Sequence, residues 1–319
     1  IPKLGLIIID EEHDQAYKQQ EGFRYHGRDL AIKRAADAHI PIVLGSATPS
    51  LETYANAISE KYRHFILDEQ FGSQASEINI VDLRREKLPA HQFISKELKQ
   101  EIVKNLEKGQ QSLLFLNRRG YAPVTLCRSC GEKINCTNCS AYLVVHKGNF
   151  GRVSLVCHYC GADEKMSSDC KSCEAEDSLI NIGVGAQRIQ EEVEALFPQA
   201  RIALVTSDTV TNFKEAEALV KKISDHDIDI IIGTQLIAKG YDFAGLTLVG
   251  VVDADSGFYS SDLRSSEKSY QLLKQVIGRA GRRKEKGRVL IQTYNPQNFI
   301  FEKLIQKDKK SFYDFEMQN

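Results

Sequence analysis

Short apolar runs alternate with longer amphipathic stretches along most of the chain. Uninterrupted apolar runs are typical of the buried strands of a parallel sheet, and apolar residues at helical spacing predict helices between them. Strands are predicted at residues 4–9, 41–44, 112–116, 201–205, 228–232, 247–252 and 288–294. Helices are predicted at residues 28–39, between Ser95 and Gly109, around Ile189 to Phe197, and at residues 212–223 and 266–277. This alternation predicts an α/β protein.

The alternation is interrupted twice, and the interruptions divide the chain into parts. The periodicity fades over residues 72–94, apart from a short apolar run at 78–83, and cysteines dominate residues 124–178. We expect a first α/β domain at residues 1–71, a connection at 72–94, a second α/β domain at 95–123 and 179–306 with an insert at 124–178, and the start of a C-terminal region at 307–319.

Composition and charge exclude several classes of protein. The 319 residues are 42% hydrophobic, which is enough for more than one core. No apolar window of about 18 residues is present and no secretory leader opens the sequence, so neither a membrane nor a secreted protein is expected. The sequence opens on a strand-like run without Met, and we expect the natural protein to extend further toward its N-terminus. A formal net charge of −1 means that nucleic-acid binding would depend on local basic patches.

An acidic box follows the first predicted strand. The run Asp10-Glu11-Glu12-His13 has the form of a Walker B box. In that role Asp10 would hold the Mg²⁺ that bridges nucleotide phosphates, and Glu11 would orient or deprotonate the attacking water. The alternative interpretation is a solvated acidic turn after a strand.

Three motifs further along the chain favour a nucleotide-driven motor. Residues 45–48, Gly-Ser-Ala-Thr, have the small hydroxyl residues of a coupling motif, and residues 233–242 have the form of helicase motif V, with Thr234, Gly240 and Asp242. Residues 275–282, Gln-Val-Ile-Gly-Arg-Ala-Gly-Arg, have the form of motif VI. Their spacing is expected to place Arg279 and Arg282 on one helical face, where they could stabilise charge on a γ-phosphate. The alternative is a solvated or salt-bridged helix face.

A phosphate-binding loop of the form G-x-x-x-x-G-K-[ST] is absent from the 319 residues. In the motor folds that these motifs resemble, the loop precedes the Walker B strand, so we expect it in an N-terminal part that the sequence lacks. The chain by itself is therefore expected to hydrolyse ATP poorly or not at all.

Aromatic and basic residues alternate after the acidic box. Tyr17, Phe23 and Tyr25 alternate with Lys18, Arg24 and Arg28. Aromatic faces can stack on unpaired bases while the cations follow the nucleic-acid backbone. The alternative is that the aromatic rings pack inside the first domain.

All eight cysteines lie in the insert and form C-x2-C pairs. Each pair is typical of a zinc knuckle, and two pairs complete a closed structural site with four thiolates. Four disulfides or an iron-sulfur site are the alternatives; a reducing cytosol opposes the first and the knuckle spacing opposes the second. Four knuckles can be combined in three ways, and spacing alone does not decide between them.

These motifs together resemble the PriA family of primosomal, superfamily 2 DNA helicases, and the resemblance covers nearly the whole chain. The segment Leu116-Asn117-Arg118-Arg119-Gly120-Tyr121-Ala122-Pro123 resembles the family's lead into its cysteine insert. The resemblance implies an incomplete RecA-like lobe 1 followed by a RecA-like lobe 2 that carries a two-zinc module. It also implies nested zinc sites, with Cys127, Cys130, Cys170 and Cys173 on one ion and Cys136, Cys139, Cys157 and Cys160 on the other.

The resemblance further implies a function. Family members are ATP-dependent 3′–5′ DNA helicases that act in replication restart at stalled forks and D-loops, unwind the lagging arm and nucleate loading of the replicative helicase. Expected partners are single-stranded DNA, single-strand binding protein, the replicative helicase and its loader, in the cytoplasm at the nucleoid. The residues expected at ATP and Mg²⁺ are Asp10, Glu11, Gly240, Asp242, Gln275, Arg279 and Arg282. Those expected at DNA are Tyr17, Lys18, Phe23, Arg24, Tyr25, Arg118, Arg119 and Thr234.

Two other functions stay open at this point. The zinc module could serve a DNA- or protein-binding platform whose motor core is regulatory or vestigial. A different superfamily 2 translocase would share the motor motifs, although an eight-cysteine insert would be unexpected there.

Overall fold

The computed structural model describes most of the chain, as two compact units. The described residues are 3–19, 21–67, 76–86, 88–89, 92–117, 124–139, 141–147, 153–157, 159–165, 167–182, 185–206, 209–210, 212–238, 243–258, 262–281 and 286–318. The first unit combines Ile1–Asp68 with Asp308–Asn319, and the second unit is Glu69–Lys307.

The first unit is a small α/β arrangement. Its elements are β1 (Ile7–Ile9), the 3-10 turn η1 (Gln15–Tyr17), β2 (Lys18–Gln19), β3 (Tyr25–His26), α1 (Gly27–Asp37), β4 (Ile42–Leu44), α2 (Leu51–Ile58) and α10 (Lys309–Gln318). The strands β1 and β4 pair in parallel, and α1 connects them. The rings of Tyr54 and Tyr313 stack with their centroids 4.4 Å apart, so α10 packs on α2. Both strands end at the same edge, where the acidic box begins.

The second unit is built on a six-stranded parallel sheet. Its strands are β5 (Glu77–Asp82), β6 (Gln111–Leu116), β12 (Ile202–Val205), β13 (Ile230–Gly233), β14 (Leu246–Asp253) and β15 (Arg288–Thr293), in the order β12-β13-β6-β14-β15-β5. Its helical elements are α3 (Leu83–Glu86), α4 (Lys96–Glu107), α5 (Ala186–Leu196), α6 (Phe213–Ser224), α7 (Gln235–Ala238), the 3-10 turn η3 (Asp255–Gly257), α8 (Ser265–Ile277) and α9 (Phe299–Gln306).

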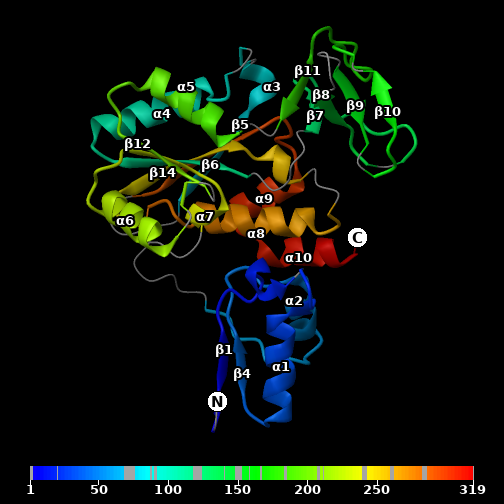
Figure 1. Ribbon diagram of the computed structural model, residues 1–319, viewed down its shortest axis with the longest axis vertical. Coiled ribbons are helices and arrows are strands. Elements are labelled where there is room, and N and C mark those ends of the chain that lie inside the picture. The colour runs from blue at the N-terminus through cyan, green and yellow to red at the C-terminus, as the bar shows by residue number, and fades with distance from the viewer. Residues whose placement is uncertain are drawn as a thin grey trace. The chain divides into compact units, whose positions relative to one another are not determined.

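Helices cover both faces of this sheet, with α4 and α5 on one face and α7 and α8 on the other (Figure 1). Leu114 of β6 packs in one cluster with Leu98 of α4 and Ile189 of α5. Leu113 and Phe115 are equally buried and, because neighbouring strand residues alternate, they point to the opposite face. Burial on both faces explains why the strands read as continuous apolar runs.

The cysteine insert is an antiparallel sheet of its own (Figure 1). Its strands are β7 (Val124–Cys127), β8 (Val144–Lys147), β9 (Val153–Val156), β10 (Asp163–Lys165) and β11 (Leu179–Ile182), in the order β10-β9-β8-β7-β11. The entering strand β7 pairs with the leaving strand β11, and Cys127 lies opposite Leu179. The insert therefore begins and ends at neighbouring positions.

The expected α/β class, the parallel sheet and the insert are confirmed by these elements. The expected connection at 72–94 includes β5, which pairs with β15 and forms an edge strand of the second sheet. Among the residues that the structure describes, no helix has the length and apolar character needed to cross a membrane.

The prediction that Arg279 shares a helical face with Arg282 is wrong. Helix α8 ends at Ile277, Gly278 is its C-cap residue, and Gly281 adopts a φ of 70° in the left-handed region. Gly278 follows the last helical residue, and Gly281, whose left-handed conformation is free of the steric cost of a Cβ, turns the chain after Arg279. Arg279 lies in the turn that follows, and Arg282 lies outside the described residues.

Candidate functional site

The two candidate hydrolytic acids follow β1 directly, at the edge where β4 also ends. The Gly45 amide donates to the Ile9 carbonyl at 2.8 Å, and the Glu12 amide donates to the Gly45 carbonyl at 3.1 Å. These bonds fasten the start of the coupling motif to the acidic box. Glu11 has a φ of 47°, a left-handed conformation that is rare for a residue with a side chain. Strain of this kind is frequent at functional sites.

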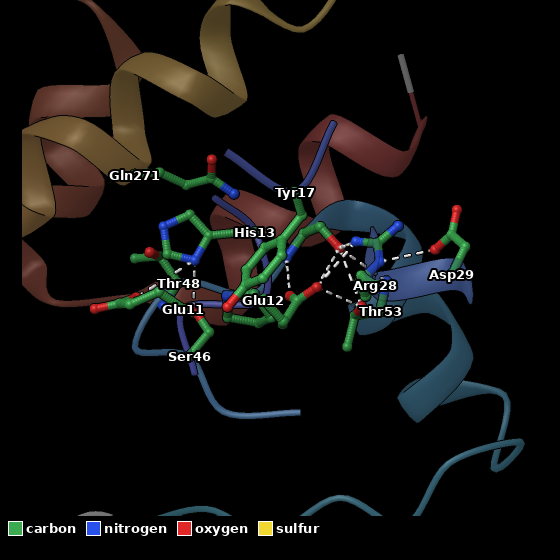
Figure 2. Close-up of polar contacts among 12 residues, drawn as sticks. Glu11, Glu12, His13, Tyr17, Arg28, Asp29, Ser46, Thr48, Thr53 and Gln271 are labelled. Atoms are coloured by element: carbon green, nitrogen blue, oxygen red, sulfur yellow. Dashed lines mark hydrogen bonds and ion pairs between the residues drawn. The ribbon is translucent and has the colours of Figure 1, made fainter. Parts of the chain in front are cut away.

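The coupling motif also contacts the box through side chains. His13 Nδ1 lies 2.7 Å from Ser46 Oγ and 3.5 Å from Glu11 Oε2, and the Thr48 amide donates to Ser46 Oγ at 2.9 Å (Figure 2). A change in the backbone around Ser46 would therefore move His13 beside Glu11. Side chains as well as backbone therefore hold the coupling motif against the acidic box.

The aromatic residues expected at DNA lie on a short hairpin. The strands β2 and β3 pair antiparallel, with Gln19 opposite Tyr25. The side chain of Phe23 is 83% exposed and that of Tyr25 is 44% exposed, with ring centroids 6.2 Å apart. A shallow pocket beside them is lined by Lys18, Gln19, Arg24, Tyr25 and His26. The alternative that these two rings pack inside the domain does not hold.

Tyr17 connects the hairpin to the acidic box. Its hydroxyl donates to the Asp10 carbonyl at 2.9 Å. Burial raises the pKa of the Tyr17 phenol, and the neighbouring carboxylates act in the same direction, so the phenol keeps the proton that it donates. Tyr17 therefore anchors the hairpin to the acidic box.

The remaining motor residues lie at opposite ends of the strands of the second sheet. Thr234 follows the carboxyl end of β13, in the turn before α7. Arg279 lies near the amino end of β14, because the Gly281 amide donates to the carbonyl of Leu246, the first residue of that strand. Gln275 occupies the last turn of α8. The predicted positions Arg118, Arg119, Gly240, Asp242 and Arg282 lie outside the described residues.

The eight cysteines form two groups of four, nested along the chain. One group is Cys127, Cys130, Cys170 and Cys173, the other is Cys136, Cys139, Cys157 and Cys160, and within each group the sulfurs lie within 4.8 Å of one another. Four thiolates around a zinc ion at about 2.3 Å require sulfurs about 3.8 Å apart. The sulfurs of Cys127 and Cys173 are 3.7 Å apart and those of Cys139 and Cys157 are 3.5 Å apart. Both groups fit tetrahedral zinc, in the arrangement that the family resemblance implies.

Local hydrogen bonds favour the thiolate form at one cysteine of each group. Burial would raise the pKa of Cys127, but its side-chain hydrogen bond with Ser178 and hydrogen bonds from backbone amides lower that pKa to about 6. Backbone amides, that of Cys160 first, lower the pKa of Cys157 to about 6 against the effect of burial. Each group thus holds one thiol that ionises readily, and a thiolate is the form that binds metal.

The first cysteine group lies against the parallel sheet. A Cβ at Gly131, next to Cys130, would come within 2.6 Å of the Tyr294 carbonyl, so only glycine fits there. Leu126 packs with Tyr294 and Phe258, which follow the carboxyl ends of β15 and β14. The second group packs instead within the insert, around Leu143 and Leu155. The first cysteine group is therefore the base of the insert.

A buried carboxylate supports this base, and the sequence patterns did not indicate it. Asp255 accepts hydrogen bonds from the Thr293 hydroxyl at 2.7 Å and from the Tyr294 amide at 2.8 Å. Burial raises the pKa of Asp255 to about 7, although these hydrogen bonds and the charge of Lys133 from the insert act in the opposite direction. A polar residue just after a long buried strand is a weak signal that pattern analysis overlooks.

We expect Asp255→Asn to change the pH dependence of stability. The folded pKa of about 7 lies above the unfolded value near 4, so between these pH values the folded state holds a proton that the unfolded state has released. The free energy of unfolding therefore falls by about 1.4 kcal/mol per pH unit as pH rises through this window. Asparagine does not titrate. Between pH 5.5 and 7.5 the free energy of unfolding, measured with denaturant, should fall by about 2 kcal/mol in the wild type relative to Asp255→Asn. Parallel pH profiles of the two proteins would contradict a raised pKa of Asp255.

Comparison with known proteins identifies first the class of protein to which this chain belongs and then its family. Residues 174–284 match the helicase conserved C-terminal domain, and residues 136–165 match the PriA DNA helicase Cys-rich region domain. The replication restart protein PriA of Rickettsia felis is 45% identical over 316 residues, 99% of this chain and 48% of that protein. The corresponding protein of Bacillus subtilis is 41% identical over 316 residues, 98% of this chain and 39% of that protein.

A solved structure of RecG bound to a three-way DNA junction has a TM-score of 0.50 at 12% identity, covers 99% of this chain and 30% of that one, and shows a likeness of fold. The parallel-sheet lobe with its matched C-terminal domain is that of a helicase. The chain belongs to the PriA family, and it spans less than half the length of these relatives.

Proposed function

We propose that the chain is the part of an ATP-driven 3′–5′ DNA helicase that joins nucleotide hydrolysis to strand binding during replication restart. The observation that carries the proposal is the bond from Tyr17 to Asp10, which joins the exposed aromatic hairpin to the candidate hydrolytic acids. A base stacked on Phe23 or Tyr25 would lie on the same short segment that positions Asp10 and Glu11. Membership of the PriA family supports DNA as the substrate.

Each group of residues has a distinct role in this proposal. Asp10 would hold Mg²⁺, which would supply positive charge against the phosphates, and Glu11 would orient the attacking water. Gln275, Gly240, Asp242, Arg279 and Arg282 complete the nucleotide side. Lys18 and Arg24 follow the DNA backbone beside the two rings, and Thr234, Arg118 and Arg119 provide further DNA contacts. Zinc gives the insert its shape and takes no part in hydrolysis.

The biological setting follows from the family and forms part of the same proposal. The protein would act in the cytoplasm, at the nucleoid, on stalled forks and D-loops, and would unwind the lagging arm. Single-strand binding protein, the replicative helicase and its loader are the proposed partners. In the competing function, a zinc-dependent binding platform, the motor core would be regulatory or vestigial.

An ATPase assay separates the motor from the platform. We expect the chain alone to hydrolyse ATP slowly or not at all, because no phosphate loop lies in its 319 residues. A protein extended to the full length of the PriA relatives should hydrolyse ATP and respond to single-stranded DNA. Rapid, DNA-stimulated hydrolysis by the chain alone would contradict the role of the phosphate loop. A full-length protein that binds DNA without hydrolysing ATP would favour the platform.

A further inference from the structure

Glu12, the third residue of the acidic box, is completely buried and has a full set of donors. Its Oε1 accepts the Ser50 amide at 2.6 Å. Its Oε2 accepts from Arg28 Nη1 at 2.9 Å, from Thr53 Oγ1 at 2.9 Å and from Ser50 Oγ at 3.1 Å. A buried charge is tolerated only when it is paired and hydrogen-bonded in this way.

The donors lie at the starts of two successive helices, α1 and α2 (Figure 2). Arg28 lies in the first turn of α1, whereas Ser50 is the N-cap residue of α2 and Thr53 lies in its first turn. Arg28 Nη1 also donates to Ser50 Oγ at 2.6 Å, which closes a ring of bonds among the three side chains. The carboxylate of Glu12 therefore fixes the starts of both helices to the end of β1.

Arg28 also connects this cluster to the hairpin. Strand β3 ends at His26, and Gly27 is the single residue between β3 and Arg28. Gly27 lies close to Tyr17, where a Cβ would be 3.4 Å from the Tyr17 carbonyl. The alternation of aromatic and basic residues grouped Arg28 with the cations that follow DNA, but its side chain is buried and paired with Glu12.

We propose that Glu12 and Arg28 are positioning residues that transmit strand binding at the hairpin to Asp10 and Glu11. The proposal rests on the proposed function and deepens it. A hairpin that moves on binding DNA moves Gly27 and with it the Arg28 guanidinium. Because Arg28 is bound to Glu12, and Glu12 is adjacent to Glu11 in the chain, that movement reaches the acid that orients water. Glu12 is also bound to Ser50 and Thr53 at the start of α2, and α2 follows the coupling motif.

The decisive experiment compares hydrolysis with and without DNA in the full-length protein. Glu12→Gln keeps the size and an acceptor but removes the charge that binds Arg28. We expect the DNA-stimulated kcat to fall about tenfold, while the basal kcat and the affinity for single-stranded DNA stay within about twofold of the wild type. A residue with a merely structural role would lower both rates together.

A gentler variant keeps the test informative if Glu12→Gln does not fold. Thr53→Val removes one hydrogen bond to Glu12 at nearly constant volume and retains the ion pair. It should lower the ratio of stimulated to basal kcat by about threefold, without a change in KM for ATP. Asp37→Asn is the matched control, because it removes an exposed ion pair with Lys33 on the same helix α1, away from the cluster. It should leave the ratio unchanged.

The outcomes distinguish a failure of the positioning role of Glu12 and Arg28 from a failure of the proposed function. A wild-type protein whose ATPase does not respond to DNA would overturn the proposed function itself. If the wild type responds, an unchanged ratio of stimulated to basal kcat in both Glu12→Gln and Thr53→Val overturns the positioning role of Glu12 and Arg28. A proportional loss of the basal and stimulated rates overturns it as well. A reduced ratio with the control at the wild-type level supports it.

Discussion

Replacing Arg279 by alanine in the full-length protein is expected to lower kcat for ATP hydrolysis by about two to three orders of magnitude. The guanidinium is proposed to stabilise negative charge that develops on the γ-phosphate, so its loss raises the barrier and leaves DNA contacts in place. The backbone around it is well held, since Ser76 Oγ donates to the Ala280 carbonyl at 2.9 Å and the Gly281 amide is bonded to β14. The substitution should therefore act locally.

DNA affinity is the second readout for this variant. Thr234, a proposed DNA contact, lies at the carboxyl ends of the strands, whereas Arg279 lies near their amino ends. Binding of single-stranded DNA should therefore change by less than about threefold. Lys286→Ala is a suitable control, because Lys286 is an exposed cation close in sequence that pairs with Glu77. Weakened DNA binding with hydrolysis intact would show that Arg279 belongs to the DNA side.

Loss of one cysteine is expected to release one zinc ion, with consequences that depend on the group. Cys136→Ser should loosen the distal part of the insert and leave the parallel sheet folded, because that group packs within the insert. Cys127→Ser should also destabilise the second unit, since its group lies against Tyr294 and Phe258. Structural zinc contributes on the order of 10 kcal/mol in small zinc domains, so the local effect should be large. Metal analysis, limited proteolysis and thermal unfolding would measure these effects.

Double variants test the nested pairing directly. Cys136→Ser combined with Cys157→Ser removes two ligands of one predicted site and should leave one zinc ion per chain. Cys136→Ser combined with Cys127→Ser removes a ligand from each site and should leave none. The reverse result would exclude the nested arrangement in favour of another combination of knuckles.

The sequence predicted the parts of the fold that depend on local patterns. A helix is predicted between Ser95 and Gly109, and the Ser95 hydroxyl accepts the Leu98 amide at the start of α4. The apolar runs at 112–116, 228–232 and 247–252 became strands of the second sheet that are buried on both faces, as β6 shows. Such features depend on neighbouring residues alone, so no tertiary information was needed to find them.

Features that depend on distant segments were not accessible in the same way. The burial of Glu12 requires donors from both α1 and α2, and the acidic box gave no sign of which of its acids faces solvent. The combination of knuckles depends on the pairing of β7 with β11, which brings Cys127 near Cys173. The alternation of aromatic and basic residues was found in the sequence, but the pairing of β2 with β3 and the inward direction of Arg28, which depends on the position of Glu12, were not.

The pairing of β7 with β11 has a consequence for how this protein family could have arisen. Because Val124 lies opposite Ile182, the 57 or so residues between them leave and re-enter the helicase lobe at one point. A simple helicase lobe could acquire such a segment in a single insertion without reordering its sheet. The same geometry makes the part of the insert between β7 and β11 exchangeable in the laboratory: an insert from a distant relative could be grafted onto these two strands.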